Sequence, residues 1–107
     1  MPRTRDKILE ERRQLKLEYG DLFDSIEALL FRSDPIGLNF EDNTDEYAAE
    51  TGTILPRLKG CYSADEVLAV VHQEFVRWFD PETAGPMRKY RQIAAEIWQL
   101  WQEHNLK

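Results

Sequence analysis

Five carboxylates between residues 41 and 50 are the side chains best suited to chemistry. They are Glu41, Asp42, Asp45, Glu46 and Glu50. A helix would place Glu46 and Glu50, four residues apart, on one face, where carboxylates can hold Mg²⁺ for reaction of a phosphorylated substrate. Such a site needs a second acidic pair on a facing helix, and no matching core-facing pair stands out. A calcium-binding loop is excluded, because Tyr47 stands where that loop requires glycine. We therefore expect no metal and no cofactor, and keep a small Mg²⁺ enzyme as an alternative.

The distribution of charge favours a protein partner with a basic surface. The chain has a net charge of -6, and residues 21–54 hold nine acids against Arg32 alone, whereas residues 1–20 carry +2. A patch of one sign attracts an oppositely charged protein and repels the phosphate backbone of nucleic acids. We expect an acidic interaction module of the immunity, inhibitor or regulatory type. Its predicted binding face is the five carboxylates together with the acidic part of the first helix, without direct nucleic-acid binding.

The other side chains with catalytic potential are isolated from one another. Cys61 is the single cysteine, so an internal disulfide is excluded and a cytoplasmic location is favoured. His72 and His104 have no cysteine or second histidine at the spacing of metal ligands. The five glycines are scattered, so no phosphate-binding loop is predicted. An enzyme is therefore less well supported than an interaction protein.

An apolar seam through the first third of the chain predicts one long helix, about residues 4–32. Its members are spaced alternately four and three apart: Ile8, Arg12, Leu15, Tyr19, Leu22, Ile26 and Leu29. A helix of that length, roughly 40 Å, exceeds what the domain needs, so residues 1–20 are expected to project. A break at Gly20 is the competing interpretation. The seam residues Ile8, Arg12, Leu15 and Tyr19 would either pair with a second copy in a homodimer or pack on the chain's own last helix.

Three further helical segments are predicted. The first begins after Asn43 or Thr44, and Gly52 and Pro56 leave two possibilities: a short turn over 45–50 followed by a helix from Thr53, or one kinked helix over 45–59. Ser63 and Glu66 form a capping box that starts a central helix. The last helix covers about 87–104.

These patterns predict an all-α fold, a compact four-helix bundle-like single domain over residues 1–107. No segment alternates apolar and polar residues as a strand does, and no apolar run approaches the ~20 residues of a membrane span. Aromatic residues of the last two helices are expected to pack in the core rather than to form a binding platform. They are Trp78, Phe79, Tyr90, Trp98 and Trp101.

Four short motifs resemble those of a family of small uncharacterised helical proteins of bacteria. They are Asp34-Pro35-Ile36-Gly37, Asp45-Glu46-Tyr47, Ile54-Leu55-Pro56-Arg57-Leu58 and Phe75-Val76-Arg77-Trp78-Phe79. The similarity covers about residues 30–104 and implies a compact all-α fold without an activity to transfer. The first two motifs suggest a structural corner of Asp34, Gly37 and Tyr47, in which Asp34 caps the second helix and Tyr47 packs beneath it.

Overall fold

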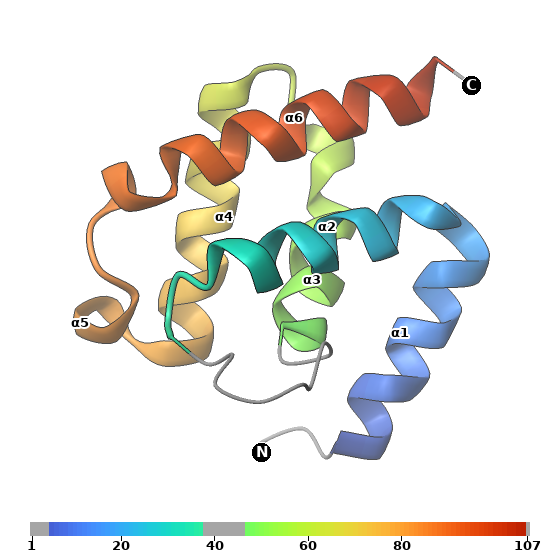
Figure 1. Ribbon diagram of the computed structural model, residues 1–107, viewed down its shortest axis with the longest axis horizontal. Helices are drawn as coiled ribbons and strands as arrows, with labels where there is room; N and C mark the ends of the chain where they lie inside the picture. Colours follow the sequence, from blue (N-terminus) through green and yellow to red (C-terminus); the bar gives the residue numbers. More distant parts are fainter. Residues whose placement is uncertain (1–4, 38–46, 107) are drawn as a thin grey trace.

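A computed structural model describes residues 5–37 and 47–106, and it is all-α over these residues (Figure 1). The predicted fold class is therefore confirmed. Six α-helices and two short 3₁₀ segments follow one another: α1 Arg5–Tyr19, α2 Asp21–Ser33, α3 Ala48–Ile54, η1 Leu55–Gly60, α4 Ala64–Phe79, α5 Pro81–Ala84, η2 Met87–Tyr90 and α6 Arg91–Asn105. None of the helices in the described part of the chain is long and apolar enough to cross a membrane.

The predicted single helix over 4–32 is wrong, because the chain breaks at Gly20. Gly20 has φ 62° and ψ -135°, a conformation that residues with a Cβ rarely adopt. It ends α1 by donating its N–H to the Lys16 carbonyl at 2.8 Å, and α2 begins at the next residue. The chain therefore changes direction between α1 and α2 (Figure 1).

The first helix packs against the rest of the chain instead of continuing the axis of α2. It contacts both α2 and α3. Leu15 is half-buried against the core, and its Cδ1 lies 3.6 Å from where a Cβ on Gly52 would stand. Tyr19 is buried and contacts Trp101 of α6, with ring centroids 6.5 Å apart. The predicted contact of the seam with the last helix is thus present at Tyr19.

The second predicted helical segment is one irregular helix, as the kinked-helix alternative proposed. It begins at Ala48 instead of residue 45, and α3 passes directly into η1 with helical backbone at Ile54 and Leu55. Pro56 lies in the first turn of η1, where its missing N–H costs no intrahelical hydrogen bond. The predicted caps Asn43 and Thr44 lie outside the described residues.

The central helix starts at the predicted capping box. The Glu66 N–H donates to Ser63 Oγ at 3.2 Å, and the Glu66 carboxylate accepts from the Tyr62 N–H at 3.1 Å. A short helix, α5, follows α4; Asp80 Oδ1 caps it by accepting from the Thr83 N–H at 2.7 Å. The last helical segment begins at Met87 as predicted, with a 3₁₀ turn before α6.

The expected core packing holds for Phe79, Tyr90, Trp98 and Trp101, whereas Trp78 is half-buried and donates its Nε1–H to Thr53 Oγ1 at 3.0 Å. In one part of the core, Phe75 lies between Tyr90 and Phe79, with centroids 5.0 and 5.9 Å away. In another part, Trp101 stacks on His104 at 5.9 Å. The helices α2 and α6 contact each other and run in opposite directions (Figure 1).

Candidate functional site

Most of the predicted acidic binding face cannot be placed. Glu41, Asp42, Asp45 and Glu46 lie outside the described residues. Glu50 is described, and only 3% of it is exposed. The Glu50 side chain on α3 is therefore buried inside the protein and does not contribute to a surface for a partner. Within the described ranges, no three His, Cys, Asp or Glu side chains are grouped closely enough to hold a metal ion.

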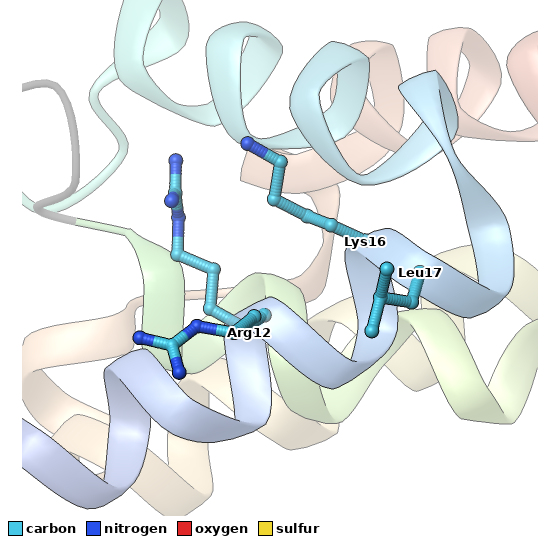
Figure 2. Close-up of a pocket in the computed structure, with 4 residues that line it drawn as sticks. Arg12, Lys16 and Leu17 are labelled. Carbon is cyan, nitrogen blue, oxygen red and sulfur yellow. The ribbon is translucent and has the colours of Figure 1, made fainter.

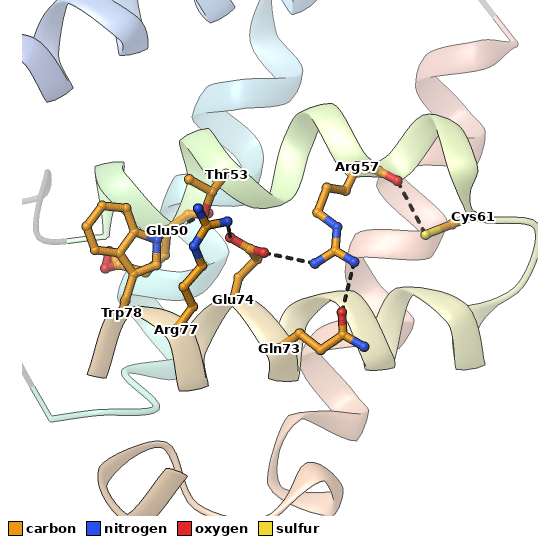
Figure 3. Close-up of polar contacts among 8 residues, drawn as sticks. All are labelled: Glu50, Thr53, Arg57, Cys61, Gln73, Glu74, Arg77 and Trp78. Atoms are coloured by element: carbon orange, nitrogen blue, oxygen red, sulfur yellow. Dashed lines mark hydrogen bonds and ion pairs between the residues drawn. The ribbon is translucent and has the colours of Figure 1, made fainter. Parts of the chain in front are cut away.

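Two other glutamates are buried as partners of arginines. The Arg12 guanidinium donates to both oxygens of Glu27, at 3.1 and 2.8 Å, so it ties α1 to α2. Glu74 of α4 accepts from Arg57 of η1 at 2.8 Å and lies 3.9 Å from Arg77 (Figure 3). Because a buried carboxylate is stable only when it is paired and hydrogen-bonded, these pairs orient helices. We assign them a structural role.

Asp34 and Tyr47 of the predicted corner meet at the two ends of the segment between α2 and α3. Asp34 was predicted to cap the second helix, and in the structure its carboxylate contacts the Tyr47 hydroxyl. The Tyr47 hydroxyl donates to Asp34 Oδ1 at 2.6 Å and accepts from the Ile36 N–H at 3.2 Å. Asp34 adopts a left-handed backbone, φ 45°, which aspartate tolerates better than most residues. Gly37 also has a positive φ, 79°. Tyr47 is completely buried, so in this structure the corner is part of the core framework.

A hollow on the outer side of α1 holds several cations, but each of them has an anionic partner. It is lined by Arg12, Arg13, Lys16 and Leu17 (Figure 2). The Lys16 side chain extends from α1 toward α2 and pairs with Asp24 at 3.1 Å. Arg13 pairs with Glu10 at 3.0 Å. These paired charges are already neutralised, which makes the hollow a poor site for an anion.

Cys61 and His72 each bind a backbone carbonyl instead of each other. The Cys61 thiol contacts the Arg57 carbonyl at 3.6 Å, and burial raises the pKa of the thiol above its usual value. The thiolate, which is the nucleophilic form, is therefore disfavoured. His72 Nε2 lies 2.9 Å from the Gly85 carbonyl. Neither geometry supports nucleophilic catalysis.

A groove between α2 and α6 combines apolar and acidic side chains. Two adjoining hollows share Leu100 and Glu103, so together they follow both helices. One hollow is also lined by Leu29, Arg32, Glu96 and Gln99, and the other by Tyr19, Asp21, Leu22, Ser25 and His104. Leu100 is half-buried at the junction, between the acidic residues of the rim. We refer to these lining residues as the α2–α6 groove.

The carboxylates of this groove are available to a ligand. Asp21 and Glu96 make no ion pair and no side-chain hydrogen bond within the described part of the chain, and Glu103 accepts only from the Gln99 amide, at 3.2 Å. This distinguishes them from Glu27 and Glu74, which are buried and paired. The groove is therefore a described surface on which apolar side chains and carboxylates without an ion pair lie together.

Part of the groove could be foreseen and part could not. Asp21 lies in the acidic part of the first predicted helix, which was expected to contact a partner. Glu96, Leu100 and Glu103 were not identified, although their spacing of four and three places them on one face of a helix. The missing information was that α6 lies antiparallel to α2.

No family model, curated protein or solved structure matches this chain. The resemblance of residues 30–104 to small helical bacterial proteins accordingly stays a prediction from the motifs in the sequence.

Proposed function

We propose that this protein is an acidic protein-interaction module that binds a basic amphipathic segment of a partner protein in the α2–α6 groove. The supporting observation is the coincidence of a half-buried leucine, Leu100, with the carboxylates Asp21, Glu96 and Glu103 around it. Charge complementarity of this kind steers association and fixes register, while the apolar centre supplies affinity.

The spacing of the lining residues suits a helical ligand. On α6, Glu96, Leu100 and Glu103 lie within an eight-residue stretch, about 10 Å of helix axis at ~1.5 Å per residue. On α2, the lining residues run from Asp21 to Arg32, about 16 Å by the same rise. A partner helix of two to three turns could therefore contact Leu100 with an apolar side chain and the rim with cations.

The test is a binding titration with a synthetic amphipathic helix that carries leucines on one face and arginines beside them. Its Kd is measured for the wild type and for two charge-matched double variants. Glu96→Gln with Glu103→Gln removes two charges from the groove, and Asp65→Asn with Glu82→Gln removes two exposed charges from the first turns of α4 and α5. We expect the groove variant to weaken binding by about fivefold or more, with little effect of the control variant.

A third variant tests the apolar centre. Leu100→Ala should also raise the Kd of the peptide. Far-UV circular dichroism should show that this variant keeps its helical fold. If both charge variants weaken binding equally and Leu100→Ala has no effect, the peptide binds by general electrostatic attraction and the proposed function is wrong.

A further inference from the structure

The end of the α2–α6 groove beside Gly20 has the chemistry of a pocket for a cationic side chain. The hollow there has a volume of about 310 Å³, at the lower end of the roughly 300–1,000 Å³ of small-ligand sites. Its lining combines acids, aromatic rings, a hydroxyl and two aliphatic side chains: Tyr19, Asp21, Leu22, Ser25, Leu100, Glu103 and His104. We propose that this pocket receives an arginine side chain of the partner, an inference that rests on the function proposed above.

Negative charge is less compensated at this end of the groove than at the other. Asp21 and Glu103 both line the pocket, and neither has an ion pair among the described residues. At the opposite end, Arg32 lines the hollow together with Glu96 and the shared Glu103, so one cation offsets part of the negative charge there. A cation of the partner therefore gains more at the Asp21 end than at the Glu96 end.

The geometry favours a guanidinium over an ammonium. Carboxylates on two different helices can be bridged by the planar fork of arginine, whereas lysine offers a compact point charge. The half-buried His104 ring lines the pocket beside the buried Tyr19 and Trp101 rings, and a guanidinium plane packs well on a flat aromatic ring. The Tyr19 ring already has a cation beside it, because Lys59 Nζ lies 5.7 Å from the ring centroid. We therefore expect the guanidinium of the partner to contact mainly His104 and the two carboxylates.

The break between α1 and α2 builds this pocket. Tyr19 is the last residue of α1 and Asp21 the first of α2, and Gly20 between them turns the chain. A continuous helix would place residues 19 and 21 about 200° apart around one axis, at 100° per residue. The turn instead lets both side chains line one hollow.

The test is an NMR titration of the ¹⁵N-labelled full chain with argininamide, which carries the guanidinium without a carboxylate. Citrullinamide has nearly the same shape but a neutral ureido group in place of the guanidinium, and lysinamide has an ammonium there; all three ligands share the α-ammonium group. We expect argininamide to give saturable shift changes at the Ser25 and Glu103 amides and lysinamide to bind more weakly. Citrullinamide should give no change at these positions.

Substitutions at the two ends of the groove test where argininamide binds. Asp21→Asn with Glu103→Gln should weaken argininamide binding by about fivefold, and Glu96→Gln, at the other end, should leave it within about twofold. Equal shifts with citrullinamide, equal binding of lysinamide, or insensitivity to the double variant would overturn the arginine pocket. If the basic helical peptide still binds the groove in that case, the proposed function stands without this pocket; if argininamide binds and the peptide does not, the function is wrong and the pocket stands.

Discussion

Individual ion pairs in this protein divide into buried pairs that hold helices together and exposed pairs that contribute little. The Arg12–Glu27 pair belongs to the first class, with side-chain exposures of 26% and 7%. The Arg13–Glu10 pair belongs to the second, with 71% and 54%. Although both pairs have a similar shortest N···O distance, 2.8 and 3.0 Å, their surroundings differ, and stability should follow the surroundings.

Glu27→Gln should lower the free energy of unfolding by about 1–3 kcal/mol, since it leaves the Arg12 charge without its bidentate partner. Glu10→Gln should change it by less than about 0.5 kcal/mol. Urea denaturation followed by circular dichroism measures both variants against the wild type. Equal effects of the two substitutions would mean that α1 is not held to α2 by the buried pair.

Tyr90 makes the stability of this protein sensitive to high pH. Its hydroxyl donates to the Ala84 carbonyl at 2.5 Å, and burial raises the pKa of Tyr90 to about 12. In the unfolded chain the pKa of tyrosine is about 10. The folded state therefore binds more protons between these values, and the contribution of Tyr90 is complete below pH 10 and lost as pH rises through 12.

Tyr90→Phe should cost about 1 kcal/mol at pH 8, because the hydrogen bond to Ala84 is lost. The difference between the wild type and the variant should shrink as pH rises from 10 to 12. Denaturant titrations at pH 8, 10 and 11.5 test this, and the other titrating groups are common to both proteins. Stability curves that remain parallel through this range would contradict the assignment to Tyr90.

At the scale of the elements, the Gly20 break determines where α1 lies. A Cβ at Gly20 would meet nothing within 4 Å, so a substitution there is costly through the backbone alone. Gly60 offers a matched control, because its Cβ would also meet nothing and its φ is not positive. We expect Gly20→Ala to destabilise the protein by about 1–3 kcal/mol. Gly60→Ala should be neutral or stabilising by up to about 1 kcal/mol.

Thermal denaturation of the two glycine variants distinguishes backbone strain from packing. If Gly20→Ala has the stability of the wild type, the chain accepts another conformation at residue 20, and a continuous helix over 4–32 becomes tenable. An unfavourable Gly60→Ala would instead point to contacts of η1 that the described structure lacks.

Elements with local signals could be predicted from the sequence, and those that depend on distant contacts could not. The capping box at Ser63 and the kinked helix around Pro56 rest on neighbouring residues, and both are present in the structure. The sequence favoured a continuous helix over the alternative break at Gly20, because the apolar seam stays in phase on both sides of this glycine. The contact that favours the break, Arg12 with Glu27, joins residues fifteen apart whose pairing no periodicity indicates.

The same reason separates the predicted binding face from the α2–α6 groove. The binding face was predicted at residues 41–50 because acidic residues are close together in the sequence there. The α2–α6 groove is lined by residues from two distant segments, 19–32 and 96–104. Sequence spacing gives the face of each helix on which a side chain lies. It does not give the neighbour that this face meets.

At the scale of the whole molecule, the described seam residues of α1 make their contacts within the chain. The radius of gyration is 13.0 Å, the value of about 13 Å expected for a compact chain of this length. Arg12 pairs with Glu27, and Tyr19 is buried against α6. Pairing of a second copy along the predicted seam of Arg12, Leu15 and Tyr19 would therefore require α1 to leave α2 and α3; the side chain of Ile8 lies outside the described ones.

The most direct test of the proposed function locates the bound basic helix on the surface. Intermolecular NOEs are measured between the unlabelled peptide and the ¹³C-labelled methyl groups of this protein. The groove predicts contacts from the peptide to the Leu100 methyls. The methyl groups of exposed Leu17 on α1 serve as the alternative apolar contact, with 78% of this residue exposed. Contacts to Leu100 would support the interaction module, and contacts to Leu17 with none to Leu100 would contradict it.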